Sequence, residues 1–216
     1  MISYWIGWSF FRISYSVLFG WTAYNRERVP KRGPVILASN HASFLDPPLV
    51  GIPLKRPLNF LARETLFRYP GVGATLRSWQ AVPVDREGSG GRGLKAILDR
   101  LLRGGGILLF PEGTRTHDGK LQAGRSGIGL AVIKSNASVI PVRVFGTYEA
   151  FGRHVRLLRR HHIRVKYGNP MQFAELRAEA KTCSKVRLKQ IYQQIADEIM
   201  TAIAKLEPCE DKNTFP

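Results

Sequence analysis

The chain has 216 residues, enough for one domain whose hydrophobic core needs neither disulfides nor a structural metal. Hydrophobic residues make up 44% and charged residues 23%, which excludes a wholly disordered chain and a collagen-like repeat. The 33 Lys and Arg residues against 16 Asp and Glu residues give a net charge of +17, which indicates an anionic partner such as nucleic acid, phospholipid or an acidic carrier. Cys183 and Cys209 have no metal-binding spacing and predict free thiols.

Residues 2–24 are the segment most relevant to a membrane. They are mostly aromatic and aliphatic, and their number is close to the roughly 20 that span a bilayer. Arg12 lies in the middle, however, and a central arginine costs about 2.5 kcal/mol or more in a spanning helix. Because Trp and Tyr favour the headgroup level, we expect a helix that lies in the interface or enters one leaflet. A buried aromatic core helix is the alternative.

The rest of the chain alternates between short apolar runs and helical stretches. The expected strands are 35–39, 58–61, 81–84, 107–110, 139–144 and 163–167. The expected helices between them are 48–52, 71–78, 94–103 and 128–134. Continuously apolar runs are typical of strands covered on both faces, so the pattern predicts an α/β fold, a mostly parallel central sheet flanked by helices.

Three parts of the chain are expected. Residues 1–28 form an N-terminal amphipathic or membrane-associated segment, and residues 29–206 form the main domain. That domain ends in a helix at 184–206, in which apolar residues recur at helical spacing after Ser184 as N-cap. Residues 207–216 are expected to be a loose tail.

The first candidate for the active site follows the strand 35–39, as Asn-His-Ala-Ser-Phe-Leu-Asp. His41 and Asp46 meet if the chain turns there and a helix begins at Asp46, which Pro47 and Pro48 favour. A carboxylate bonded to one ring nitrogen leaves the other able to accept a proton. No serine stands in a G-x-S-x-G context, so His41 is expected to activate an incoming hydroxyl. The alternative is that Asp46 only caps a helix and His41 is an ordinary strand-end residue.

The second candidate is Phe-Pro-Glu-Gly-Thr-Arg-Thr at 110–116, where an apolar strand ends. Ligands of open α/β sheets bind outside the carboxyl ends of the strands. Pro111 and Gly113 bracket the turn, so the backbone can approach a ligand closely. Arg115 offers a planar fork suited to phosphate. A solvated turn with an incidental arginine is the alternative.

The third candidate, Gly-Ser-Gly-Gly-Arg-Gly at 88–93, matches the dinucleotide-binding pattern G-x-G-x-x-G. Three residues, 85–87, separate it from the preceding strand, whereas that pattern needs a tight strand–turn–helix. We therefore interpret these glycines as a flexible connection.

Taken in order, the His-x4-Asp block, the Phe-Pro-Glu-Gly-Thr-Arg block and Val-Ile-Pro-Val at 139–142 resemble the glycerolipid acyltransferases with an HxxxxD motif. Among these, the 1-acyl-sn-glycerol-3-phosphate acyltransferases are the most similar type. The resemblance runs from about 29 to 170, and residues 79–86 resemble the family's second block. The segment 124–127, Gly-Arg-Ser-Gly, departs from the Phe-Lys-x-Gly of relatives, which leaves the role of Arg125 open.

The resemblance implies the fold of the glycerol-3-phosphate acyltransferases and a reaction. A fatty acyl group moves from acyl-ACP or acyl-CoA to the hydroxyl of lysophosphatidate, giving phosphatidate for phospholipid biosynthesis; glycerol-3-phosphate or another lysophospholipid is the alternative acceptor. His41 would be the general base and Asp46 would orient it. No metal and no prosthetic group is implied, because the thioester itself is activated. The implied substrate-binding residues are Arg63, Arg86, Glu112, Gly113, Thr114 and Arg115.

The excess of positive charge fits a lipid substrate, because each Lys or Arg near an anionic membrane contributes about 1 kcal/mol to binding. The densest basic cluster lies at 153–166 and is expected to face the membrane, to receive an acyl carrier protein, or to be a plain solvated loop. No nucleic-acid-binding motif accompanies the charge. We expect a membrane-associated protein on the cytoplasmic face, the inner membrane in a bacterium. A non-catalytic basic membrane-binding protein is the alternative from another class.

Overall fold

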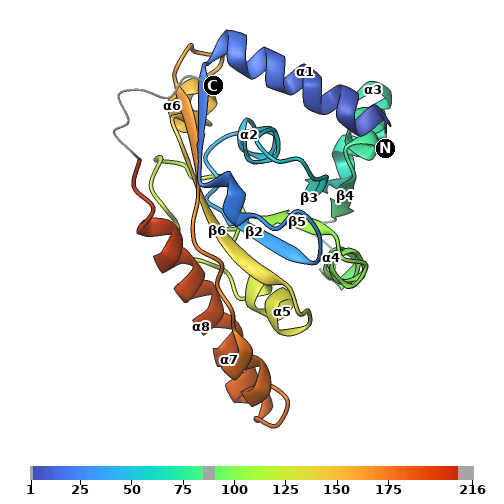
Figure 1. The fold of residues 1–216 in the computed structure, drawn as a ribbon, viewed down its shortest axis with the longest axis vertical. Coiled ribbons are helices and arrows are strands. Elements are labelled where there is room, and N and C mark those ends of the chain that lie inside the picture. The colour runs from blue at the N-terminus through green and yellow to red at the C-terminus, as the bar shows by residue number, and fades with distance from the viewer. Residues whose placement is uncertain (1, 85–90, 209–216) are drawn as a thin grey trace.

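The computed structural model describes residues 2–84 and 91–208, and within them the chain forms a seven-stranded sheet (Figure 1). The strand order is β1-β7-β6-β2-β5-β3-β4. All neighbouring strands are parallel except β6 and β7. The strands are β1 (Trp21–Tyr24), β2 (Val35–Ser39), β3 (Leu58–Arg63), β4 (Ala81–Val84), β5 (Gly106–Leu109), β6 (Ser138–Phe145) and β7 (Ile163–Tyr167).

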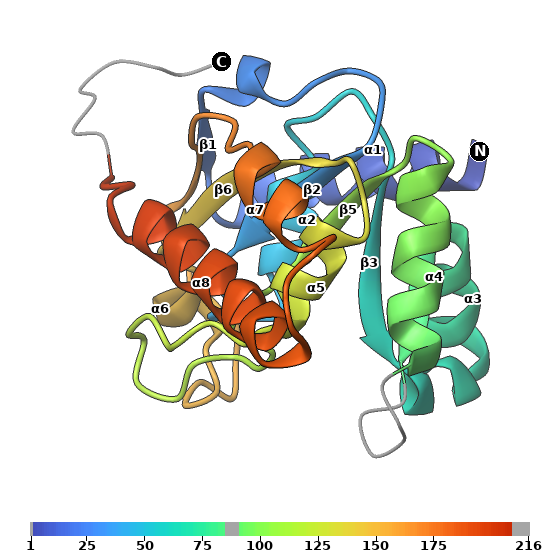
Figure 2. The same ribbon diagram turned by 90° about the horizontal axis from the view of Figure 1, so that it is seen from below.

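Helices cover both faces of the sheet, and side chains of β2 alternate between two cores. Val35 and Leu37 pack with residues of α1 and α2, whereas Ile36 and Ala38 pack with residues of α4, α5 and α8. Figure 2 shows α5, α7 and α8 in front of the sheet and α1 behind it. The helices are α1 (Ile2–Leu18), α2 (Asp46–Gly51), α3 (Pro70–Ser78), α4 (Gly91–Leu102), α5 (Gly127–Ile133), α6 (Thr147–Phe151), α7 (Ala174–Glu179) and α8 (Lys185–Ala204), with 3-10 turns at Arg26–Arg28 and Glu64–Arg68.

The mostly parallel sheet is confirmed, and each of the six expected strands is present with bounds equal or close to those expected. The four expected helices correspond to α2, α3, α4 and α5. The Ser184 cap is also confirmed, because its Oγ accepts a hydrogen bond of 3.2 Å from the backbone N–H of Arg187. Helices α6 and α7 have only five and six residues, too few to show a helical period, and the sequence did not predict them.

The expectation of one helix over residues 2–24 is wrong at its C-terminal end. The helix α1 ends at Leu18, and Gly20 takes a φ of +61°, which reverses the chain. Residues 21–24 then pair in parallel with β7 as an edge strand. Part of the segment 1–28 therefore belongs to the sheet, whereas the division of the chain into three parts stays a prediction.

One face of α1 is packed on the domain. Tyr15 donates a buried hydrogen bond of 3.0 Å to the carbonyl of Leu45. The hydroxyl oxygen of Tyr4 accepts one of 3.1 Å from the N–H of Leu58. The Arg12 guanidinium lies 5.3 Å and 5.1 Å from the ring centroids of Trp8 and Trp21, so the central charge is held between aromatic rings. This face fits the alternative of an aromatic core helix.

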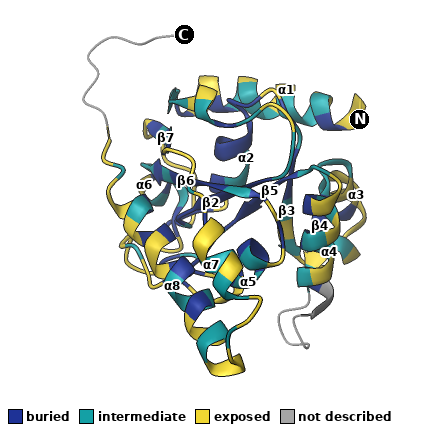
Figure 3. Ribbon diagram, turned by 60° about the horizontal axis from the view of Figure 1, so that its bottom comes forward, coloured by how far each residue is buried: buried dark blue, intermediate teal, exposed yellow. Residues whose placement is uncertain are grey.

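The other face of α1 is apolar and exposed, and exposed residues recur along the helix between residues of intermediate exposure (Figure 3). The spacing of three or four residues places the exposed side chains on one stripe, which we call the outer stripe. Among the described residues, no helix has the length and apolar character needed to cross a membrane. The outer stripe consists of Ile2, Ile6, Phe10, Ile13 and Val17.

The buried hydrogen bond of Tyr15 ties α1 into the cooperative fold. Replacement of Tyr15 by Phe leaves the Leu45 carbonyl unsatisfied, so we expect the free energy of unfolding in urea to fall by about 1–2 kcal/mol. The exposed Ser9→Ala substitution on the same helix serves as the control and is expected to be neutral. Equal unfolding midpoints for Tyr15→Phe and the original protein would show that α1 is not docked in this way.

Candidate active site

The first candidate segment leaves the sheet at the carboxyl end of β2, where the side chain of Asn40 bonds to the backbone of β6. Its side-chain amide donates to the carbonyl of Val144 at 3.3 Å, and its carbonyl oxygen accepts from the N–H of Val144 at 2.8 Å. The side chain thus continues the pairing of β2 with β6 by one more step. The position of His41, the next residue, is fixed relative to the central strands.

His41 and Asp46 meet, as the sequence predicted. The Nδ1 atom of His41 lies 2.8 Å from Oδ2 of Asp46. The same oxygen accepts hydrogen bonds of 2.7 Å from the N–H groups of Ala42 and Ser43. These bonds reach back into the loop, and α2 begins at Asp46 itself, so the alternative in which Asp46 only caps a helix is wrong.

The Asp46 carboxylate determines which nitrogen of His41 carries the proton. A carboxylate oxygen can only accept, so Nδ1 is the N–H donor, and Nε2 of the neutral ring has the lone pair. The Asp46 side chain is fully buried, while 13% of the His41 side chain is exposed. The ring of Phe110 stacks on the imidazole with 3.8 Å between centroids and 16° between planes. The imidazole of His41 is therefore held by the Asp46 carboxylate at one edge and by the Phe110 ring on one face.

The second candidate segment follows β5, the parallel neighbour of β2, and contacts the first one directly. The N–H of Thr116 donates to the carbonyl of His41 at 2.8 Å. In return, the N–H of His41 donates to Oε1 of Glu112 at 3.3 Å. Gly113 has a φ of +71°, a backbone conformation that residues other than glycine rarely adopt, and it closes this turn. The two segments thus form one hydrogen-bonded unit at the carboxyl edge of the sheet.

Glu112 is buried beneath this unit. Burial raises the pKa of its carboxyl to about 7, the N–H groups of His41 and Gln122 lower the pKa, and the nearby charge of Asp46 raises it. Among the described residues Oε2 has no hydrogen-bond partner. Glu112 is not among the residues that line the cavity described next, so it supports the site through its hydrogen bond with the His41 N–H.

A cavity of about 1260 Å³ lies between α1, α2, α3 and the sheet, with His41 in its wall. Most of its wall is aromatic or aliphatic and comes from α1, α2 and β3, with Phe11, Phe60 and Trp79 among the largest side chains. The arrangement therefore joins a candidate base to an apolar space. The polar and charged residues of the wall are Ser14, His41, Arg63, Thr65, Thr114, Arg115, Arg125 and Arg153, together with Tyr4 and Tyr15.

The structure brings five of the predicted substrate-binding residues to this region: Arg63, Gly113, Thr114 and Arg115 line the cavity, and Glu112 lies beneath. Arg115 stacks on Phe44, with its Cζ 3.6 Å from the ring centroid. Arg86 falls outside the described residues, as do residues 88–90 of the glycine run, whereas Gly91 and Gly93 lie in the first turn of α4 and not in a connection.

Sequence reasoning missed Arg153 as a residue of the site. Its Nη2 donates a hydrogen bond of 2.7 Å to the hydroxyl of Thr114, which lies 39 positions earlier in the chain. Arg125, whose role was open, also lines the cavity, and its N–H donates to the carbonyl of Pro111 at 2.9 Å. No motif spacing links Arg153 to the second segment, so the basic cluster in which it lies was its only signal.

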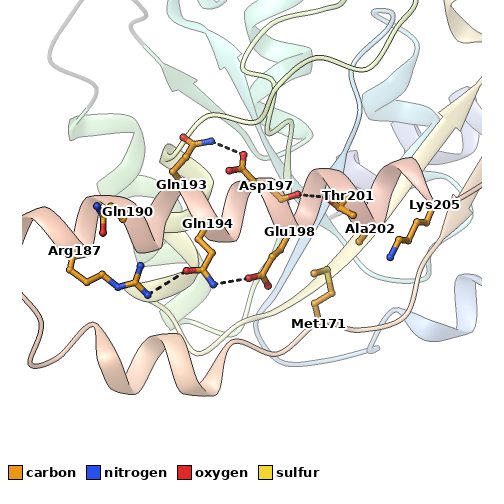
Figure 4. Close-up of a pocket in the computed structure, with 10 residues that line it drawn as sticks. All are labelled: Met171, Arg187, Gln190, Gln193, Gln194, Asp197, Glu198, Thr201, Ala202 and Lys205. Atoms are coloured by element: carbon orange, nitrogen blue, oxygen red, sulfur yellow. Dashed lines mark hydrogen bonds between the residues drawn. The ribbon is translucent and has the colours of Figure 1, made fainter.

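A second hollow, of about 770 Å³, runs along α8 on the other face of the sheet (Figure 4). Its polar side chains pair with one another at helical spacing, Gln193 with Asp197 at 2.8 Å and Gln194 with Glu198 at 3.0 Å. Its ten lining residues include neither histidine nor cysteine. Across the described ranges, no three His, Cys, Asp or Glu residues gather where they could hold a metal ion.

The fold and the His41–Asp46 pair define an α/β protein able to take a proton from a ligand at the carboxyl edge of its sheet. A model of the family described as acyltransferase matches residues 21–145, more than half of the chain. The chain therefore belongs to the acyltransferase family.

Individual relatives agree with the family. The chain is 25% identical over 189 residues to the 1-acyl-sn-glycerol-3-phosphate acyltransferase of Bacillus subtilis, a match that covers 87% of this chain and 90% of the relative. It is 30% identical over 116 residues to the chloroplastic 1-acyl-sn-glycerol-3-phosphate acyltransferase LPAT1 of Arabidopsis thaliana, which covers 53% of this chain and 32% of that protein. It is also 30% identical over 119 residues to the lyso-ornithine lipid O-acyltransferase of Pseudomonas aeruginosa, over 52% of this chain and 43% of the relative.

A solved structure shares the fold. The 1-acyl-sn-glycerophosphate acyltransferase PlsC from Thermotoga maritima superimposes with a TM-score of 0.71 and 22% sequence identity. The match covers 94% of this chain and 80% of the other. The expected sheet and its flanking helices are thus those of a known acyltransferase structure.

The raised pKa of Glu112 predicts a pH dependence of stability. Because the folded state holds this proton more tightly than the unfolded chain, loss of the proton between about pH 5 and pH 8 costs the folded state stability. Glu112→Gln removes this cost. We expect the free energy of unfolding of Glu112→Gln, minus that of the original protein, to increase by on the order of 1 kcal/mol from pH 5 to pH 8. A difference between the two proteins that is the same at every pH does not affect this test. Urea unfolding at several pH values measures the increase, and a difference that is flat with pH would contradict the buried carboxyl.

Proposed function

We propose that this protein transfers a fatty acyl group from an acyl thioester to the free hydroxyl of lysophosphatidate and releases phosphatidate. The observation that carries the proposal is the placement of the His41–Asp46 pair in the wall of an apolar cavity whose other polar groups include four arginines. The names of the Bacillus and Arabidopsis relatives support the choice of acceptor.

In the proposed reaction, Nε2 of His41 accepts the proton of the acceptor hydroxyl. The oxygen attacks the thioester carbonyl carbon, a carbon–oxygen bond forms, and the carbon–sulfur bond breaks. The departing thiolate takes the proton from the imidazolium. Asp46 stabilises the imidazolium and holds the ring in its tautomer, a role for which its buried carboxylate and its 2.8 Å bond to Nδ1 are suited. No resident metal or prosthetic group takes part, since the thioester of acyl-ACP or acyl-CoA supplies the activated acyl group.

The acceptor phosphate is assigned to the arginines of the cavity. A guanidinium makes charge-assisted, often paired hydrogen bonds to phosphate oxygens. Arg115 and Arg63 line the cavity, and the Thr114 hydroxyl, which accepts from Arg153, lies beside Arg115 in the chain. Arg86, outside the described residues, is assigned to the same phosphate, while Glu112 and Gly113 support the turn.

The apolar part of the cavity is assigned to the acyl chain, and α1 to the membrane. The acyl chain loses contact with water when it enters a wall built from residues such as Phe11, Phe60 and Trp79. The outer stripe of α1 places apolar side chains outward on the helix that covers this cavity, as expected of a helix lying in an anionic bilayer surface. We infer a membrane-associated protein on the cytoplasmic face.

The proposal is tested by acyl transfer from a labelled acyl thioester to lysophosphatidate in detergent–lipid micelles, with glycerol-3-phosphate as the second acceptor. The original protein is expected to form phosphatidate, and His41→Ala is expected to lose about 100-fold or more of the rate, the usual share of a general base. If product formed from glycerol-3-phosphate alone, glycerol-3-phosphate would replace lysophosphatidate as the acceptor in the proposed reaction. No product from either acceptor, or a near-normal rate for His41→Ala, would contradict the proposal.

Arg115 is expected to act through the acceptor. Loss of its charge-assisted hydrogen bonds should raise the KM for lysophosphatidate about tenfold or more in Arg115→Ala and leave the KM for the thioester nearly unchanged. Arg103→Ala removes an equally positive but exposed side chain that is not in the cavity wall and serves as the matched control. An equal effect of Arg115→Ala on both substrates would argue against a phosphate site there.

A further inference from the structure

The loop that joins α6 to β7 combines exposed leucines with exposed arginines. We call residues 152–162 the basic loop. Leu157 is 80% exposed and Leu158 is 54% exposed, so Leu157 in particular gains little hydrophobic free energy from folding. On both sides of the pair stand arginines that are also exposed: Arg153, Arg156, Arg159 and Arg160.

The basic loop is held in this shape by its own contacts. The side chain of Val155 is buried, and the N–H of Val155 donates to the carbonyl of Gly152 at 3.1 Å. The N–H of Arg159 donates to the carbonyl of Ala150 at 2.9 Å. Because Val155 faces the core and the loop is fixed on both sides of the leucines, Leu157 is held outward.

The end of the basic loop lies beside the end of α1. The ring Nε2 of His162 is 2.9 Å from the hydroxyl of Thr22, and the N–H of Ile163 donates to the carbonyl of Gly20 at 3.2 Å. Figure 1 shows α1 and the loop after α6 at the same end of the molecule. Leu158 of the loop and Leu18 of α1 line the same cavity as His41. The basic loop therefore stands at the cavity, next to the helix with the outer stripe.

We propose that the basic loop is a second membrane contact, in which Leu157 enters an anionic bilayer surface while Arg156 and Arg160 bind lipid phosphates. The inference rests on the membrane contact proposed for α1. Two contacts on the same side of the cavity hold it against the bilayer, so that a lipid can pass from the leaflet toward His41 without crossing water.

A lipid surface fits the basic loop better than the acidic surface of a carrier protein. The loop and the outer stripe of α1 are neighbouring apolar surfaces at one end of the molecule, and a bilayer can cover both at once. Arginine stems can also lie along an apolar surface while the guanidinium binds a headgroup. An acidic carrier would match the arginines and leave the outer stripe in water.

A fluorescent probe on the basic loop tests the proposal. In a Cys183→Ser, Cys209→Ser background, Leu157→Cys is labelled with an environment-sensitive dye and mixed with phosphatidylcholine vesicles that contain about one third phosphatidylglycerol. We expect a blue shift and quenching by lipids with brominated acyl chains. The control Val186→Cys labels another exposed apolar residue, at the start of α8 and at the opposite end of the molecule, and should show neither.

Charge variants give a second measurement. Arg156→Gln with Arg160→Gln is expected to bind these vesicles about 25-fold more weakly, because each arginine near an anionic surface contributes about fivefold. The control Lys181→Gln with Lys185→Gln removes two exposed charges at the far end of the molecule and should bind normally. Transfer to a short-chain lysophosphatidate, kept below the concentration at which it forms micelles, should stay unchanged in both.

Three results would overturn the proposal: a probe at position 157 that stays in water while the protein is bound to vesicles, a blue shift only with an acidic acyl carrier protein, or a protein that binds no anionic vesicles. The readout is binding and not turnover. A protein whose loop enters vesicles but that transfers no acyl group would therefore contradict the proposed function and leave this inference standing.

Discussion

The site depends on one carboxylate oxygen, Oδ2 of Asp46, which accepts from two backbone N–H groups and from His41. The Asp46 side chain is fully buried, and the hydrogen bonds to Oδ2 replace part of its water, while Oδ1 has no hydrogen-bond partner among the described residues. Three donors on one atom require the chain from His41 to Asp46 to curl around it, so the same requirement sets the loop, the start of α2 and the tautomer of the imidazole. The orientation of the proposed catalytic base is thus a consequence of how one oxygen of a buried carboxylate is satisfied.

The parallel sheet supplies the second requirement, which is that two loops meet. Neighbouring parallel strands β2 and β5 end at the same edge, where hydrogen bonds join His41 to Glu112 and to Thr116. Both loops stand on strands that are buried on both faces, and a site on such a rigid base keeps its geometry. The apolar cavity arises because α1 packs on the same face of the sheet as α2 and contributes Tyr4, Tyr15 and Phe11 to its wall.

Local chemistry decided what could be predicted from the sequence. Strand 35–39 is a continuous apolar run with clear ends, strand 163–167 alternates between apolar and charged residues, and the His-x4-Asp spacing indicated the contact between His41 and Asp46. The edge strand β1 was missed because its Trp, Thr, Ala and Tyr continue the aromatic composition of α1, and only pairing with β7 makes it a strand. The place of Arg153 at Thr114 depends on two loops far apart in the chain, so no local pattern contained it.

The tautomer of His41 is the most direct test of this account, because the proposed base needs a lone pair on Nε2. Nitrogen NMR of protein labelled in its histidine rings, with His41→Gln used to assign the signal, measures which nitrogen carries the proton. In the neutral form of the ring we expect the proton on Nδ1, and a switch to the other tautomer or to a mixture in Asp46→Asn. A His41 ring protonated on Nε2 alone in the original protein would contradict it.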